Sequence, residues 1–242
     1  MISNSLNATL NLFAASSSAN MGIIGQLQQS PLLDDLAPEL KVVGMMTLMS
    51  FIPLFIISMT AFTRIIIVLS MLRQALGVQQ TPPNAVLITL AIFMTYFTMA
   101  PAIEVIEKNA ITPYLQQQIT LDETITRIEA PLRAFMIHQT READFAVILK
   151  VSNTPVPASA NDISTAKLIP AFMLSELTTA FKMAFVIFLP FLLVDLVVAS
   201  ILMSLGMIMV PPITIALPLK IMLFVVIDGW ALITEALISS FS

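Results

Sequence analysis

The chain has 242 residues, of which 57% are apolar, 11% are charged and none is cysteine, and its formal net charge is −4. A soluble domain carries about a quarter of its residues as charged side chains, so this composition, with a mean hydropathy of +0.93, indicates an integral membrane protein. The absence of cysteine from the sequence excludes disulfides, thiolate catalysis and cysteine-based metal sites. The negative charge argues against a nucleic-acid partner.

Residues 1–41 are predicted to form a flexible N-terminal arm. Residues 1–40 contain no Lys or Arg, and residues 16–40 are rich in Ser, Asn, Gln and Asp, a composition that cannot bury much apolar surface. The stretch from Leu6 to Ala15 is only weakly apolar and lacks a positive flank. We therefore expect no complete secretory signal within the arm.

The first apolar block, residues 42–103, is predicted to be a helical hairpin. Its first run is long enough to cross a bilayer, because about 20 residues span the hydrocarbon core. Pro53 is predicted to kink this helix, which continues to a stop at Gly77. The polar turn around Pro82 and Pro83 then leads into a second apolar run over residues 85–103.

Residues 104–168 are predicted to form a small polar helical insert, with a loop at 152–162. Short loops with positive charge favour the cytoplasm, so Arg73 mildly places the first turn there and the insert on the periplasmic side. The insert holds the single histidine, His138, without the three or four converging ligands that a metal needs. Six glycines in the chain and no glycine-rich loop argue against a nucleotide site.

The second apolar block, residues 169–242, is predicted to be another helical hairpin with a methionine-rich turn. Its first helix begins at Ser164 or Thr165, and kinks are expected at Pro190 and Pro218. The predicted fold is therefore an all-α membrane protein, with two proline-kinked helical hairpins flanking the polar insert. Paired, interrupted apolar segments point to a transport path.

Four ionisable residues lie within the apolar runs. Such residues are costly in a membrane, face protein or water, and carry a functional hypothesis. We expect structural ion pairs or hydrogen bonds between subunits, with a proton or ion relay as the alternative. The set is too sparse for a continuous relay and comprises Arg64, Asp195, Lys220 and Asp228.

The turn of the second hairpin contains Met207, Ile208 and Met209, between Gly206 and Pro211. Methionine is flexible and polarizable, so it conforms to varied surfaces. If several copies of this turn met on one axis, they would form a soft apolar constriction that excludes water. Ordinary packing of the same residues is the alternative.

The segment Pro170–Trp230 closely resembles the FliP family of flagellar export proteins, called SctR in injectisomes. PAFMLSEL and PLKIMLFVVIDGW resemble its two signature regions, and FTRIIIVLSMLRQALG, QQTPPN and PLRAFMIHQTREAD match it upstream. The resemblance covers roughly residues 45–240. Several long motifs in the same order make it specific.

The resemblance implies a non-enzymatic role without cofactors. It implies that about five copies assemble with FliQ-like and FliR-like subunits into a helical cone, the entry portal for unfolded flagellar proteins, alongside FlhB-like and FlhA-like export components. The cone would belong to the flagellar basal body and lie largely on the periplasmic side of the bacterial inner membrane. Met207, Ile208 and Met209 fall on the loop that seals the pore, and Phe135 and Glu176 fall on positions linked to contacts between protomers.

Two other functions fit an apolar helical chain. A small-solute or proton transporter would need the four ionisable residues to act in turn, and flux through the reconstituted single chain would favour it. A non-pore scaffold would tolerate polar residues at Met207 and Met209. A membrane enzyme ranks last, because the sequence contains no catalytic constellation.

Overall fold

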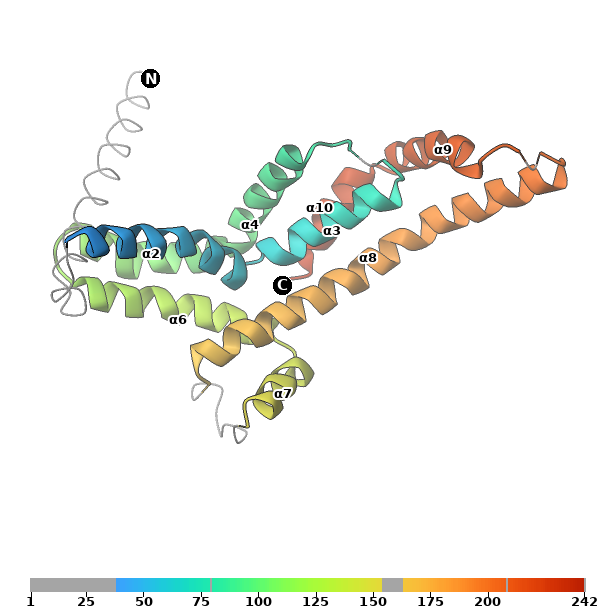
Figure 1. Ribbon diagram of the computed structural model, residues 1–242. Helices are drawn as coiled ribbons and strands as arrows, with labels where there is room; N and C mark the ends of the chain where they lie inside the picture. The colour runs from blue at the N-terminus through green and yellow to red at the C-terminus, as the bar shows by residue number, and fades with distance from the viewer. Residues whose placement is uncertain (1–37, 79, 154–162, 208, 242) are drawn as a thin grey trace, which may run out of the picture. The chain divides into compact units, whose positions relative to one another are not determined.

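The computed structural model describes residues 38–78, 80–153, 163–207 and 209–241, and every element within them is a helix (Figure 1). The helices are α2 (Pro38–Met59), α3 (Phe62–Ala75), α4 (Asn84–Ile106), a π-helix (Glu107–Ile111), α5 (Thr112–Leu115), α6 (Leu121–Gln139), α7 (Glu142–Val151), α8 (Thr165–Ser204), α9 (Pro212–Val226) and α10 (Gly229–Ser239). The all-α prediction is confirmed for this part of the chain.

Two helical stretches are long and apolar enough to cross a membrane, Asn84–Leu115 and Thr165–Ser204. The number of candidate spans rises to four if α2 with α3, and α9 with α10, each form one bent span. Many large apolar side chains on these helices are exposed, including Phe93 and Phe97 of α4 and Leu193 and Leu196 of α8. Soluble monomers rarely expose apolar patches of this extent, so lipid or neighbouring protein must cover these faces.

The chain divides into two compact units, and the larger one contains residues 57–104 and 130–242. Its core is built on α3, whose buried residues Ile65, Val68, Leu69 and Leu72 recur every three or four positions on one helix face. This face packs along α8 (Figure 1). Leu87, Ala91 and Met94 of α4, Ala180 of α8 and Leu237 of α10 complete the main cluster.

The smaller unit contains residues 1–56 and 105–129, of which the structure describes 38–56 and 105–129. Thr120 and Glu123 form a capping box at the start of α6, because each backbone N–H reaches the other residue's side-chain oxygen at 3.4 Å. Arg127 donates to the carbonyl of Asn109 at 3.1 Å. Residues 104–168, predicted as one insert, are thus shared between the two units.

The helix boundaries follow the sequence signals in two places. Helix α8 begins at Thr165 after Ser164, as predicted. Helix α3 ends at Ala75, and Gly77 adopts a φ of +80° just beyond it, so the predicted stop at Gly77 is confirmed. The predicted arm, residues 1–41, lies outside the described residues up to position 37, and α2 begins at Pro38. Most of the predicted loop, residues 154–162, also lies outside them.

The three prolines at which kinks were predicted do not end a helix. Pro53, Pro190 and Pro218 lie inside α2, α8 and α9. The first block is instead interrupted at residues 60–61, where the Thr63 hydroxyl donates to the carbonyl of Ile57 at 3.1 Å. The last run is interrupted at residues 227–228, where α9 and α10 meet at 66°. Proline removes only one backbone donor, and the surrounding packing decides where the helix ends.

Candidate functional site

The turn between α8 and α9 is held by a Schellman motif at the end of α8. Gly206 adopts a φ of +74°, a conformation that glycine adopts without steric penalty. Its N–H donates to the carbonyl of Met203 at 3.1 Å, and the N–H of Met207 donates to the carbonyl of Leu202 at 3.0 Å. Helix α8 therefore ends at a defined position, and Met207 is the first residue of the loop.

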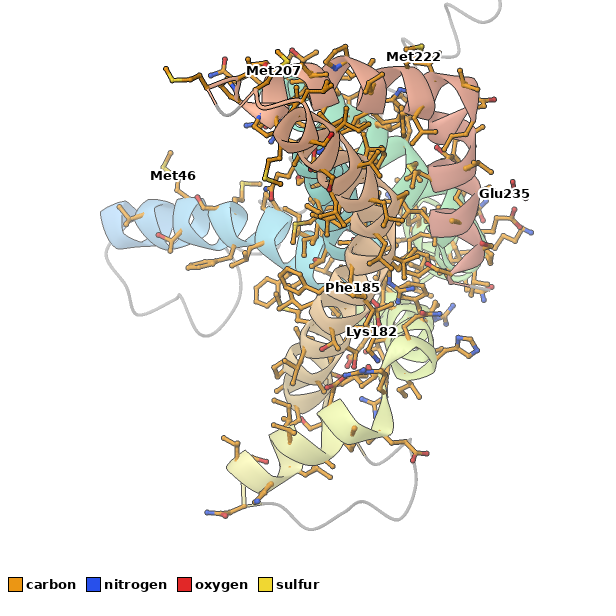
Figure 2. All side chains as sticks on the ribbon, turned by 90° about the vertical axis from the view of Figure 1, so that its right-hand side faces the viewer. Met46, Lys182, Phe185, Met207, Met222 and Glu235 are labelled. Atoms are coloured by element: carbon orange, nitrogen blue, oxygen red, sulfur yellow. The ribbon has the colours of Figure 1, made fainter. Side chains whose placement is uncertain are left out.

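Among the large apolar side chains of the described hairpin, that of Met209 is the most exposed. Met207 is 43% exposed and Met209 is 95% exposed, whereas Ile208 lies outside the described residues. Figure 2 shows Met207 at the end of α8 beside the start of α9. Val210, the next residue, packs against Val198, Leu202 and Ala216. The loop is anchored at both ends, and the side chain of Met209 is almost fully exposed.

The second hairpin also contains a buried ion pair. Lys220 of α9 donates to the Asp195 carboxylate of α8 at 2.6 Å and to the carbonyl of Ala75 at 3.2 Å. Lys220 is buried, while the Asp195 side chain is 39% exposed. Because Ala75 is the last residue of α3, the ammonium group also meets the negative end of that helix dipole. One cation thereby joins α3, α8 and α9.

Arg64 forms the most fully bonded polar cluster of the larger unit. Its side chain is 2% exposed, and Glu176, which is 0% exposed, accepts from Nε at 3.0 Å and from one terminal nitrogen at 2.5 Å. The remaining contacts are to the Ser240 carbonyl at 2.9 Å, the Ser240 hydroxyl at 3.1 Å and the Gln139 amide oxygen at 2.9 Å. A guanidinium carries five N–H donors, so this geometry supplies each of them with an acceptor.

An aromatic layer covers this cluster. The Arg64 guanidinium lies 3.8 Å from the ring centroid of Phe241, which is a cation–π contact. Phe135 stacks on Phe241 and meets Phe172 edge to face. The Gln139 amide also donates to the Phe241 carbonyl at 3.0 Å. Contacts within the chain therefore lock its C-terminal end onto α3, α6 and α8.

Asp228 is exposed on the single chain and adopts a left-handed conformation, with φ +50° and ψ +52°, between α9 and α10. The helix ends at this residue, so the side chain leaves the face that packs within the chain. Its burial against another subunit stays a prediction. The following Gly229 is buried, and a Cβ at that position would overlap the ring of Phe224.

A second polar cluster fastens α7 to α8. Arg141 forms a bidentate pair with Asp144 at 2.7 and 2.8 Å, and the Ser175 hydroxyl donates to Asp144 at 2.7 Å. The backbone N–H of Arg141 donates to the same hydroxyl at 3.0 Å. The hydrogen bonds from Arg141 lower the pKa of Asp144, with a smaller contribution from Ser175, although burial opposes this shift.

Within residues 38–153 and 163–241, apart from 79 and 208, no three His, Asp or Glu side chains lie close enough together to hold a metal ion. The ring nitrogen Nδ1 of His138 lies 3.2 Å from the side-chain amide nitrogen of the neighbouring Gln139. The polar groups of the described core bind one another instead of converging on an open position. The geometry of the described residues consequently offers an apolar loop and three structural ion pairs.

The FliP family model matches residues 45–237, which is most of the chain. The chain belongs to the FliP family. It is 44% identical to the flagellar biosynthetic protein FliP of Bacillus subtilis (strain 168) over 236 residues, which are 98% of this chain and 100% of that protein. It is 48% identical to the protein of that name from Pectobacterium carotovorum, over 81% of this chain and 76% of the relative. For Aquifex aeolicus (strain VF5) the identity is 43%, over 86% and 87%.

The FliP-family match includes the loop and all three ion pairs, but sequence reasoning did not identify the partners of Arg64. Arg64 was expected to pair with another subunit, yet its partners lie in the same chain: Glu176, which is 112 positions away, Gln139 and Ser240. Glu176, expected at a contact between protomers, is buried inside the chain. Gln139 is the last residue of α6, next to the apolar face of that helix. This position is the sequence signal that could have indicated it.

Proposed function

We propose that this chain is a pore-forming core subunit of the flagellar type III protein export gate, which passes unfolded flagellar proteins across the inner membrane. Membership of the FliP family supports a role in flagellar protein export. The observation that carries the pore assignment is the α8–α9 loop, where Met207 and Met209 are exposed at a fixed helix end. The proposed role involves no covalent chemistry.

The mechanism we propose is an apolar seal formed by several copies of this loop. Each copy contributes Met207, Ile208 and Met209 to a ring around one axis, and a narrow apolar constriction excludes water and ions. The Schellman motif at Gly206 and the packing of Val210 hold the loop in place. Unbranched thioether side chains can then fold aside around an incoming polypeptide without movement of the helices.

Assembly is the second part of the proposal. About five copies join FliQ-like and FliR-like subunits in a cone, with FlhB-like and FlhA-like components nearby. The exposed apolar faces of α4, α8 and α9 offer surfaces that neighbouring subunits would cover. Phe135 and Glu176 act on contacts between protomers by fixing the C-terminal end against α6 and α8. The gate lies largely on the periplasmic side, with the insert, residues 104–168, on that side and the two hairpins around the pore.

The test is a double substitution, Met207→Ala with Met209→Ala, in the native host. Small-ion leakage, membrane potential and export of flagellar subunits are followed in the same cells. The matched control is Met222→Ala, which removes an exposed methionine of α9 outside the loop (Figure 2). Leakage with export retained in the loop variant alone supports the seal.

A tight membrane with normal export in the loop variant would refute the seal and favour a non-pore scaffold. The transporter alternative has less support, because Arg64 already has an acceptor for each N–H and Lys220 is already paired with Asp195. A substrate would have to break these bonds to bind. Ion flux through single reconstituted chains would nevertheless restore that alternative.

A further inference from the structure

Sulfur distinguishes the methionines of the α8–α9 loop from every other apolar side chain around them. A thioether takes up an oxygen atom and becomes a sulfoxide, which converts a flexible apolar side chain into a polar one. The sequence contains 16 methionines and no cysteine, so the sulfur chemistry of this chain is that of methionine alone. Which of these sulfurs reacts depends on which of them a small oxidant can reach.

Exposure separates the methionines whose side chains the structure describes. Met209 is 95% exposed, the largest exposed fraction among them, whereas Met99 in the core is 3% exposed. Met203 and Met222 are exposed as well, but they lie on apolar faces of α8 and α9 that lipid or neighbouring protein must cover. Met209 therefore differs from them in lying in a loop and not on the face of a helix.

The loop backbone indicates what surrounds that side chain. Residues 205–211, between the end of α8 and the start of α9, are not helical. At membrane depth, irregular backbone occurs only where it is buried in protein or lines a water-filled cavity. Met209 is not buried within its own chain. In a ring of such loops around one axis, the sulfur borders the water that fills the lumen on either side of the constriction, so a water-soluble oxidant reaches it without crossing lipid.

We propose that Met209, together with Met207, is an oxidation site that makes the seal sensitive to peroxide. This inference rests on the proposed function of the loop. The sulfur lone pair attacks one oxygen of hydrogen peroxide, an S–O bond forms and the O–O bond breaks. The proton on the transferred oxygen passes to the departing hydroxide, which leaves as water. Sulfur is thereby oxidised and the peroxide is reduced.

The sulfoxide changes the property on which the seal depends. An apolar constriction blocks ions because water leaves it, and a sulfoxide oxygen accepts hydrogen bonds from water and keeps it there. Ile208, between the two methionines in the sequence, carries no sulfur and cannot change in this way. A ring of oxidised loops is therefore hydrated at two positions of each copy, and small ions leak through it.

The first measurement locates the oxidation. Membrane vesicles from the native host, which contain the complete gate, are treated with hydrogen peroxide, and the gain of oxygen at each methionine is followed over time by peptide mass spectrometry. If the rate follows exposed area, Met209 gains oxygen up to about thirtyfold faster than Met99, because their exposed fractions are 95% and 3%. Oxidation of Met209 no faster than that of Met99 overturns the proposal, because protein would then cover the loop.

The second measurement is the leakage of small ions from the same vesicles before and after peroxide. Each variant is compared with its own untreated sample, so that a change in the resting seal does not enter the result. We expect peroxide to raise leakage in the unmodified gate. Met207→Leu with Met209→Leu keeps the loop apolar but removes its sulfur, and this variant loses the rise. Met222→Leu is the matched control outside the loop and retains it.

A sulfoxide at Met209 without a rise in leakage overturns the inference, and so does an equal rise in the leucine variant of the loop. These failures are separable from failure of the seal. If Met207→Ala with Met209→Ala leaks but peroxide does not open the unmodified gate, the seal stands and only the oxidation inference fails. If neither treatment produces a leak, the proposed seal fails with it.

Discussion

Replacing Arg64 by methionine tests whether the buried cluster at the C-terminal end stabilises the fold as a unit. The substitution leaves the Glu176 carboxylate fully buried without its cation. It also removes the N–H donors that bind the amide oxygen of Gln139 and the carbonyl of Ser240. Breaking one side of a buried ion pair costs about 3–5 kcal/mol. Arg64→Met and Glu176→Met should each lower the free energy of unfolding by this amount.

The double variant, Arg64→Met with Glu176→Met, shows whether the two side chains contribute to the free energy of unfolding as a coupled pair or independently. No charge remains buried, so only the polar atoms of Gln139 and Ser240 lose a partner, at about 1–3 kcal/mol for a buried unsatisfied group. We expect the double variant to lose about 2–6 kcal/mol, against about 6–10 kcal/mol for the sum of two singles. The difference is the coupling energy of the pair.

The assay is reversible unfolding of the full chain in mixed detergent micelles, followed by far-ultraviolet circular dichroism. Arg73→Met is the control, because that guanidinium binds Pro82 and Asn84 near the surface, where such contacts contribute about 0–1 kcal/mol. If the stability loss of the double variant equals the sum of the losses of the two single variants, the coupling is refuted. Single losses no larger than that of the control would refute the importance of the cluster itself.

Two further predictions concern local geometry and pH. Gly229→Ala should destabilise the α9–α10 junction by about 1–3 kcal/mol, as overpacking does, because the added Cβ overlaps the ring of Phe224. Gly44→Ala is the control, because its Cβ meets no atom within 4 Å, and it should be neutral or stabilising. Equal unfolding midpoints for the two variants would contradict the packing argument. Asp144 has a lowered pKa in the folded state, so the stability it confers is present above its unfolded pKa and is lost as pH falls through the folded value. The free energy of unfolding should therefore decrease as the pH is lowered below about 4, and Asp144→Asn should make this decrease smaller. If the variant shows the same dependence of unfolding free energy on pH, the acid sensitivity belongs to carboxylates other than the one bound by Arg141.

The structure gives packing roles to positions that the sequence marks only weakly. Phe135 and Gln139 lie on a helix of mixed polarity, and nothing local distinguishes them from its other residues. Their roles come from contacts with residues far away in the sequence: Phe135 stacks on Phe241, and Gln139 accepts a hydrogen bond from Arg64 of α3. Both contacts form only when the helices pack.

The amino-acid sequence by itself determined the helical, membrane-embedded class of this protein, because apolar runs and their spacing depend on neighbouring residues alone. Glycine likewise marked the end of α3 at Gly77, since a left-handed residue just beyond a helix is a local requirement. Tertiary structure decided that Arg64 pairs with Glu176 and that Asp228 leaves the packed face. It also decided that the helix breaks lie away from prolines such as Pro53. Those outcomes depend on contacts between residues far apart in the chain, and the free energy of packing there outweighs the local preference of any single residue.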